Sequence, residues 1–166
     1  MMTDLYDLPG HLIRRMHQIS VSAFAAETKA AGFDLTPMQF AALCMLEENP
    51  GIEQATLAGL VAIDRATIGG VVARLEARGL LERSVSRTDR RARVLTLTET
   101  GAALLRDVRP VVRRAQDVML KQLGPGERDT LVTLLSKVTT AENDLSRAPL
   151  RPAEGAATSG KPSQNG

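Results

Sequence analysis

Residues 54–101 carry the clearest succession of elements in this chain, and they read QATLAGLVAIDRATIGGVVARLEARGLLERSVSRTDRRARVLTLTETG. The segment predicts a short helix over 54–63 and a second helix that begins after Asp64 and ends before Gly79. A strand, an arginine-rich tip and a returning strand follow as far as residue 97. Two helices and a hairpin in this order are typical of a winged helix-turn-helix, which binds DNA.

The second predicted helix has one apolar face and one face of small and basic residues. Asp64 is a favourable N-cap residue. The buried stripe consists of four apolar residues at helical spacing: Ile68, Val71, Val72 and Leu75. The residues away from that stripe are Arg65, Ala66, Thr67, Gly69, Gly70, Ala73 and Arg74.

The two adjacent glycines of this helix indicate close approach to another molecule. Each costs a helix about 1 kcal/mol relative to alanine, which points to a packing or docking reason for them. A thin face with a few arginines suits insertion into a DNA groove. The alternative is an ordinary amphipathic helix in which both glycines are tolerated.

A hairpin is predicted after Gly79, whose lack of a side chain suits a left-handed helix end. Residues 80–83 and 94–97 have the short apolar pattern of two paired strands. The basic residues between them are Arg87, Arg90, Arg91 and Arg93. Arginine on a hairpin tip suits the negative potential of a narrow minor groove, and Asp89 can hold an arginine side chain in position. A solvated charge cluster is the alternative, but the helix-turn-helix directly before the hairpin favours DNA.

The chain resembles the MarR family of transcriptional regulators from residue 8 to residue 146. The resemblance is carried by LTPMQFAAL at 35–43, ATIGGVVARLEARGLLER at 66–83 and DRRARVLTLTETG at 89–101. Members of that family are homodimers whose terminal helices form a shared base beside two winged lobes. The resemblance implies that double-stranded DNA is contacted by Arg65, Thr67, Gly69 and Arg74 of the second helix, and by Asp89, Arg90 and Arg91 of the wing tip. Which of Arg90 and Arg91 enters the minor groove stays open.

The predicted fold class is mainly α with a small β-wing. We expect an N-terminal dimerisation and effector helix in residues 1–34, a winged lobe in residues 35–97, C-terminal dimerisation helices in residues 98–147 and a disordered tail in residues 148–166. Residues 1–34 and 98–147 together are called the helical base. In the base, a first helix ends near Gly32. In the lobe, Thr36 and Pro37 begin the next helix, which runs to about Glu48.

Two long helices are predicted after the wing. Thr98 is the expected N-cap of the first, and its apolar seam consists of Leu104, Val108, Val111, Ala115 and Val118. Pro110 is expected to kink this helix. A second helix over residues 126–144 has four apolar residues on its predicted buried side: Leu131, Leu134, Leu135 and Val138. The alternative to a homodimer interface is core within one chain, and the length of these apolar stripes favours the interface.

The composition restricts the class of protein. The chain has 166 residues, 43% hydrophobic content and a net charge of +2, and arginines outnumber acids eight to five between residues 52 and 97. This balance suits a small DNA-binding protein, while the scarcity of aromatic residues argues against a platform for single strands. The sequence has neither the pattern of a signal peptide nor a segment long enough to span a membrane, so we expect a cytoplasmic protein.

A polar stripe on the first helix is the candidate effector site. It consists of His11, Arg15, Gln18 and Ser22, at steps of four, three and four. In the resembled family the effector commonly lies between this helix, the second helix and the winged lobe. The stripe suits an anion, and Met38 and Phe40 offer apolar surface to a ring. The predicted ligand-binding residues for a small aromatic carboxylate of the hydroxynicotinate or benzoate type are therefore His11, Arg15, Gln18, Met38 and Phe40. Arg14 is the alternative to Arg15, and a solvated helix face is the alternative to a site.

We expect a repressor that a small aromatic carboxylate releases from a pseudo-palindromic operator. Two alternatives to this function stay open. A redox sensor would use Cys44, the single cysteine, although its apolar surroundings favour an inert thiol. An architectural DNA-binding protein would need no effector. No enzyme motif, cofactor or metal site is predicted, because His11 and His17 lie about 240° apart around a helix.

Overall fold

The computed structural model describes residues 4–153. A long helix, a group of three shorter helices with a small sheet, a second long helix and a C-terminal helix follow one another along the chain. In order, the elements are η1 (Leu5–Asp7), α1 (Pro9–Ala30), α2 (Pro37–Glu48), β1 (Ile52–Glu53), α3 (Gln54–Leu60), α4 (Arg65–Ala77), β2 (Leu81–Val85), β3 (Arg93–Leu97), α5 (Glu99–Met119), α6 (Pro125–Ala141) and η2 (Asn143–Leu145).

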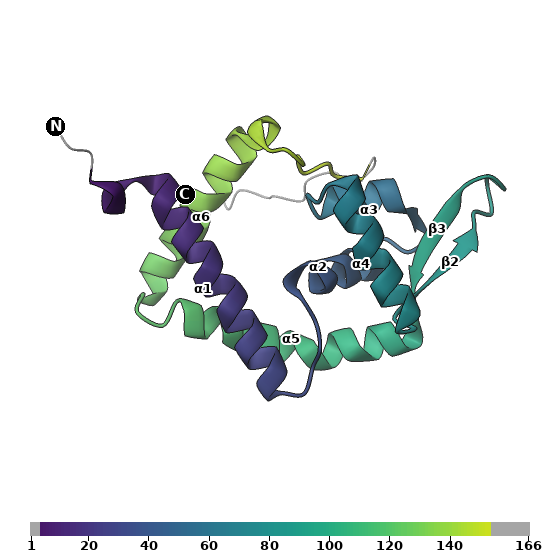
Figure 1. Ribbon diagram of the computed structural model, residues 1–166, viewed down its shortest axis with the longest axis horizontal. Helices are drawn as coiled ribbons and strands as arrows, with labels where there is room; N and C mark the ends of the chain where they lie inside the picture. Colours follow the sequence, from purple (N-terminus) through teal and green to yellow (C-terminus); the bar gives the residue numbers. More distant parts are fainter. Residues whose placement is uncertain (1–3, 154–166) are drawn as a thin grey trace, which may run out of the picture.

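Helix α5 connects the two parts of the molecule. It leaves the wing at one end, and along its course it packs against α2 and against α1 (Figure 1). The hairpin of β2 and β3 projects from the opposite end of the molecule from α1 and α6 (Figure 1). The predicted mainly α fold with a small β-wing is confirmed.

Local side-chain bonds fix the starts of the helices where the sequence predicts them. The Thr36 hydroxyl accepts from the Gln39 backbone N–H at 3.2 Å, and the Gln39 side chain accepts from the Thr36 N–H at 3.0 Å. This reciprocal capping box, followed by Pro37, begins α2. The Thr98 hydroxyl likewise accepts from the Gly101 N–H at 3.0 Å and begins α5.

The sheet has three antiparallel strands in the order β1-β3-β2. Strand β2 pairs with β3 from Leu81 opposite Leu97 to Val85 opposite Arg93. The two-residue strand β1 adds to the other edge of β3, with Ile52 opposite Leu95. The sequence prediction did not include β1, because two residues are too few to show an alternating pattern.

The hydrophobic core lies in the winged lobe but does not end at its predicted boundary. Most of its buried members come from α2, α3, α4, β2 and β3. Three further members, Leu105, Val108 and Val111, belong to α5. The lobe core therefore extends beyond the predicted boundary between residues 97 and 98, because these α5 residues close it.

The apolar seam predicted for α5 is mostly buried within one chain. Val108, Val111 and Ala115 are buried, whereas Val118 is 46% exposed and Leu105 takes the fully buried place expected for Leu104. The helix continues through Pro110 without a break. Because the buried residues face α1 and α2, most of the seam is intrachain core and not an interface.

The apolar residues of helix α6, in contrast to those of α5, are exposed. None of its residues is buried, and Leu134, Leu135 and Val138 are 55%, 44% and 57% exposed. The prediction that they lie on a buried side is wrong within a single chain. A second molecule that covers them would restore the expected burial.

The chain after α6 departs from the predicted disordered tail. Residues 148–153 lie beside α3, where the Arg151 N–H donates to the Gly59 carbonyl oxygen, while residues 154–166 lie outside the described part. Among residues 4–153, no single helix has the length and apolar character to cross a membrane, and α3 and α4 reach that length only together, across a bend of 109°.

Candidate nucleic-acid interface

Helix α4 begins at a fully formed cap. The Asp64 carboxylate accepts from the Thr67 N–H at 2.9 Å and from the Thr67 hydroxyl at 2.8 Å. These hydrogen bonds favour the ionised form and hold the pKa of Asp64 below its usual value. The predicted stripe of Ile68, Val71, Val72 and Leu75 is buried, so the orientation of α4 on the lobe is confirmed.

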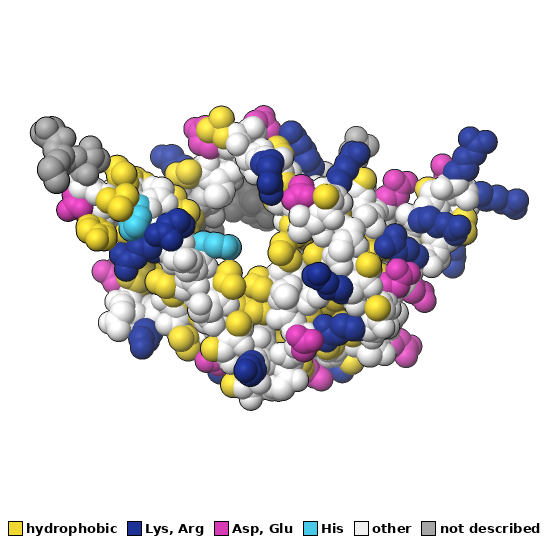
Figure 2. All heavy atoms as spheres, viewed as in Figure 1, with side chains coloured by type: hydrophobic (Ala, Val, Ile, Leu, Met, Phe, Trp, Pro, Cys, Tyr) yellow, Lys and Arg dark blue, Asp and Glu magenta, His cyan; other side chains and the backbone are white. Residues whose placement is uncertain are grey.

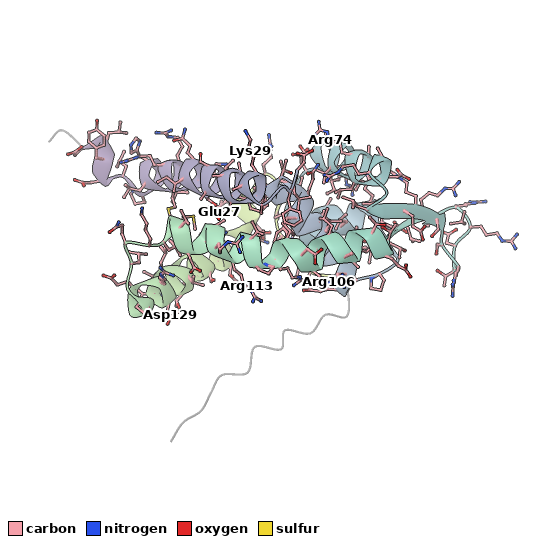
Figure 3. The ribbon with its side chains drawn as sticks, turned by 90° about the horizontal axis from the view of Figure 1, so that it is seen from below. Glu27, Lys29, Arg74, Arg106, Arg113 and Asp129 are labelled. Carbon is pink, nitrogen blue, oxygen red and sulfur yellow. The ribbon has the colours of Figure 1, made fainter. Side chains whose placement is uncertain are left out.

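The opposite face of α4 is open to solvent. Arg65, Thr67 and Arg74 are exposed, and Gly69 is half-buried. A Cβ built on Gly70 would have no heavy atom within 4 Å, so packing within the chain does not require that glycine. Figure 3 shows Arg74 directed away from the body of the molecule. A helix face of this kind can enter a groove without displacing any protein side chain.

The turn between α3 and α4 is longer than the sequence predicts. Helix α3 ends at Leu60, three residues before the predicted end at Ile63. Ala62 has a left-handed φ of 51°, where glycine is the usual residue. The Ile63 N–H donates to the Ala58 carbonyl oxygen at 3.0 Å across this turn. The turn sets the angle at which α4 leaves α3.

The wing tip is a short turn with its arginines outermost. The Asp89 carboxylate accepts from the backbone N–H of Arg91 at 2.8 Å, so it shapes the turn and does not hold an arginine side chain as predicted. Arg87, Arg90 and Arg91 are exposed. Figure 2 shows basic side chains gathered at this end of the molecule. Their spacing on a narrow hairpin suits contact with nucleic acid phosphates or a minor groove.

Arg83 on β2 joins the wing to the helix-turn-helix, and sequence reasoning missed it. Its guanidinium donates to the Glu76 carboxylate at 2.9 Å and to the Gln54 side chain at 3.2 Å. One side chain thus connects β2, the end of α4 and the start of α3. Gln54 lies 29 residues before Arg83, and Glu76 lies seven residues before it but in a different element, so no periodic pattern signals the contact.

The five predicted effector residues do not meet at one place. Gln18 accepts a hydrogen bond from Arg14 at 3.2 Å, and the Phe40 ring packs on Phe24 at 6.2 Å between centroids. Met38 lies in a separate groove at the start of α4, beside Asp64. His11 packs edge-on against Tyr6 of η1, and its Nε2 is buried with no hydrogen-bond partner among residues 4–153. Arg15 and Met38 line different grooves of one chain, and the assignment of the five residues to one ligand site stays a prediction.

Arg15 lies in a groove between α1 and α6. The groove has a volume of about 400 Å³ and is lined by Arg15 together with Leu12, Ile13, Met16, Ile19, Leu131 and Leu135. Arg15 is its single charged residue, and the remaining lining is apolar. A larger cavity of about 1020 Å³ between α6, the chain that follows it and the α3–α4 turn contains none of the five predicted residues.

Cys44 has the surroundings of a structural thiol. It is partly buried in α2 beside the lobe core, and desolvation raises the pKa of its thiol, against the opposing influence of Arg109. A raised pKa lowers the thiolate fraction at neutral pH and with it the reactivity of the sulfur. No cluster of three or more metal-ligating side chains occurs within residues 4–153.

Comparisons with known proteins agree with this architecture. A sequence profile of the MarR family matches residues 35–92. The chain is 36% identical over 141 residues to the HTH-type transcriptional repressor NicR of Pseudomonas putida, which covers 85% of this chain and 88% of that protein. The aligned length exceeds that of the winged lobe, so the similarity includes part of the helical base.

Two solved structures of similar fold concern DNA binding directly. One is BpsR of Bordetella bronchiseptica, from work on the regulation of its DNA binding by 6-hydroxynicotinic acid; the TM-score is 0.78 at 34% identity, over 84% of this chain and 98% of that one. The other is the transcriptional repressor CouR bound to a 23-mer DNA duplex, with a TM-score of 0.76 at 33% identity, over 84% of this chain and 97% of that one.

Proposed function

The chain belongs to the MarR family of transcriptional regulators, and from that premise we propose a repressor that binds duplex DNA as a homodimer and leaves it when a small aromatic carboxylate binds. The observation that carries the DNA-binding part is the exposed face of α4, with Arg65, Thr67 and Arg74 beside a wing whose arginines point outwards. Arginine is the residue best suited to phosphate and guanine, because its planar fork donates two parallel hydrogen bonds.

The homodimer rests on the exposed apolar face of α6. Val132, Leu134, Leu135 and Val138 are each at least 44% exposed in one chain. A second copy would cover them, and a two-fold axis would then place two α4 helices on one face of the duplex. Half-sites about one helical turn apart, roughly 34–36 Å, are the expected geometry.

The first experiment selects duplexes from a random-sequence pool with the full-length protein. We expect one pseudo-palindromic sequence with the half-site spacing given above, which is called the selected duplex below. An architectural protein would instead retain the pool without enrichment. Arg74→Ala should weaken binding to the selected duplex and flatten its salt dependence, because each protomer of the dimer then neutralises one phosphate fewer. Arg113→Ala on α5 is the matched control, and equal loss in both variants would refute the assigned α4 face.

The effector proposal rests on Arg15 and on the relatives. The groove around Arg15 combines one guanidinium with an apolar lining, which is what a ring bearing one carboxylate requires. NicR and BpsR are similar over most of this chain, and the study of BpsR concerns 6-hydroxynicotinic acid, a compound of that chemistry. In this proposal Leu131 and Leu135 replace Met38 and Phe40 as the surface against the ring, and a second copy closes the groove.

Titration of the DNA complex tests the effector directly. Wild type on the selected duplex is titrated with benzoates, hydroxycinnamates and nicotinates. We expect at least one of them to release the duplex. The coupling free energy between carboxylate binding and DNA binding should be about 1–3 kcal/mol. Arg15→Ala should bind the duplex normally but fail to release it, while Arg14→Ala, its matched neighbour, should still respond.

Two outcomes decide against this effector assignment. If Arg14→Ala loses the response and Arg15→Ala keeps it, the carboxylate pairs with Arg14. If no carboxylate releases the duplex, and peroxide releases it in a manner abolished by Cys44→Ser, the protein is a redox sensor.

A further inference from the structure

The chain that follows α6 is a built structural element and returns to the winged lobe. We call residues 143–153 the C-terminal strap. Asn143 donates from its side-chain amide to the Leu150 carbonyl oxygen at 3.0 Å and accepts from the Leu150 N–H at 2.8 Å. Arg151 pairs with Asp144 at 3.3 Å. These contacts close the strap on itself, and Figure 1 shows it running from the end of α6 to α3.

The strap contacts α3 at Gly59. The Arg151 N–H donates to the Gly59 carbonyl oxygen at 2.8 Å. A Cβ added to Gly59 would lie 2.9 Å from the Arg151 Cβ and 3.3 Å from its carbonyl oxygen. Glycine disfavours a helix by about 1 kcal/mol relative to alanine, so its presence inside a short helix needs a reason. The close approach of the strap supplies one.

The seated strap brings Arg147 to the first turn of α4. One Nη of Arg147 lies 3.4 Å from the carboxylate of Asp64, which caps that helix. The Arg147 side chain is 89% exposed, so its guanidinium is accessible from outside. Together with Arg65 and Arg151 it lines a groove of about 720 Å³ between the strap and the helix-turn-helix, in which Asp64 is the single acid.

The position of Arg147 at the start of α4 indicates which part of a bound duplex its side chain can contact. In a helix-turn-helix the N-terminal residues of the recognition helix reach the DNA, and arginines beside that helix bind backbone phosphates. A guanidinium that reaches the cap of α4 therefore lies at the edge of the docked duplex. Its exposed pairing with Asp64 is weak, because solvent screens such pairs, so the side chain can turn to a phosphate at little cost.

We propose that Arg147 is a further DNA-contacting residue, carried by the C-terminal strap to the start of α4, where it binds a backbone phosphate. The proposal rests on docking of DNA through α4, as in the proposed function. Arg151 and Asn143 are positioning residues, since they hold the strap and not the DNA. The DNA-binding surface of one chain thus consists of α4, the wing tip and the strap.

The test measures affinity for the selected duplex across a series of salt concentrations. Each phosphate contact contributes about 0.9 to the slope of log affinity against log salt. Because both protomers of the proposed dimer carry the change and each loses one contact, Arg147→Ala should lower the slope by about two units. Arg113→Ala, which changes an exposed arginine on α5, should leave the slope unchanged. An unchanged slope for Arg147→Ala, with a lowered slope for Arg74→Ala, overturns the proposal and leaves docking through α4 intact.

Two further variants separate contact from indirect effects. Asp64→Asn keeps a good N-cap but removes the carboxylate. If Arg147 acts only by neutralising Asp64, then Arg147→Ala changes nothing in the Asp64→Asn background, and the proposal fails. Gly59→Ala favours the α3 helix yet displaces the strap, so it should reproduce the slope loss with Arg147 still present. Normal slope in Gly59→Ala, in a protein with an unchanged unfolding midpoint, would also contradict the role of the strap.

Discussion

The winged lobe differs from α6 and the outer side of α1 in how far its apolar residues are buried. In the lobe, Leu43, Leu57 and Leu75 are fully buried against neighbours from the same chain. In the base, the apolar residues of α6 and the outer side of α1 are largely exposed, as for Leu134 at 55% and Ile13 at 57%. The lobe is therefore complete as a single-chain structure, whereas the base presents the kind of surface that another molecule covers.

Their arginines differ in the same way. In the base, Arg114 pairs with Glu27 and Arg128 with Asp117, which join α5 to α1 and to α6. In the lobe, Arg65, Arg74 and Arg90 have no carboxylate within salt-bridge distance among residues 4–153. Arg114 and Arg128 therefore hold helices of the base together, whereas Arg65, Arg74 and Arg90 stay available to an external anion. This difference agrees with the proposal that the lobe binds DNA.

The largest expected effect comes from opening the lobe core. Leu75→Ala should lower the free energy of unfolding by about 2–5 kcal/mol, because it removes fully buried methyl groups and leaves a cavity. Urea denaturation followed by circular dichroism measures this. The control is Leu145→Ala after α6, where the side chain is 83% exposed and the expected change is below about 0.5 kcal/mol. Similar losses of unfolding free energy in both variants would contradict the difference in burial between the lobe core and the exposed residues after α6.

A matched pair of exposed residues tests whether the base is an assembly surface. Leu135 on α6 and Val85 on β2 are 44% and 43% exposed. Leu135→Glu should weaken self-association at least about tenfold, since a leucine buried at an interface contributes about 1.5–3 kcal/mol. Val85→Glu should leave self-association unchanged. Sedimentation equilibrium without DNA measures both, and dissociation by Val85→Glu alone would place the interface on the lobe.

A double variant of the wing tests whether the lobe contacts the minor groove of DNA. Replacing Arg90 and Arg91 together with alanine should weaken binding several-fold more on duplexes with A·T-rich flanks than on those with G·C-rich flanks. A·T-rich flanks have the narrow minor groove whose negative potential attracts arginine. Fluorescence anisotropy with the two duplexes makes the comparison. Equal losses on both flanks would mean that the wing contacts phosphates only, and single variants then identify which arginine contributes more.

The smallest effect concerns the acid sensitivity of the lobe. The pKa of Asp64 is lowered in the folded chain, chiefly by the Thr67 backbone N–H, so its stabilisation is present above the unfolded pKa and is lost as pH falls through the folded one. Below pH of about 4 the wild type should therefore lose more stability than Asp64→Asn, which caps α4 without titrating. Thermal unfolding midpoints between neutral and acidic pH test this, and parallel curves would contradict it.

The family, the α4 stripe and the wing hairpin were predictable because their signals are local. Apolar spacing placed Ile68 and Leu75 on the buried side, and Thr36 and Thr98 marked helix starts through bonds to residues three positions away. The MarR resemblance of the sequence is confirmed by relatives above 30% identity, and with it the prediction of a regulator and not an enzyme. The homodimer and the assigned DNA and ligand contacts stay predictions.

Only the tertiary structure decided which distant residues meet. Arg83 contacts Glu76 and Gln54, and Arg151 sits on Gly59, across sequence separations that leave no periodic trace. The same apolar spacing produced a buried stripe on α5 and an exposed one on α6, because α5 lies against α1 and α2 while nothing in the described chain covers α6. Periodicity fixes which side of a helix is apolar, but burial also needs a partner, and the partner is chosen by long-range packing.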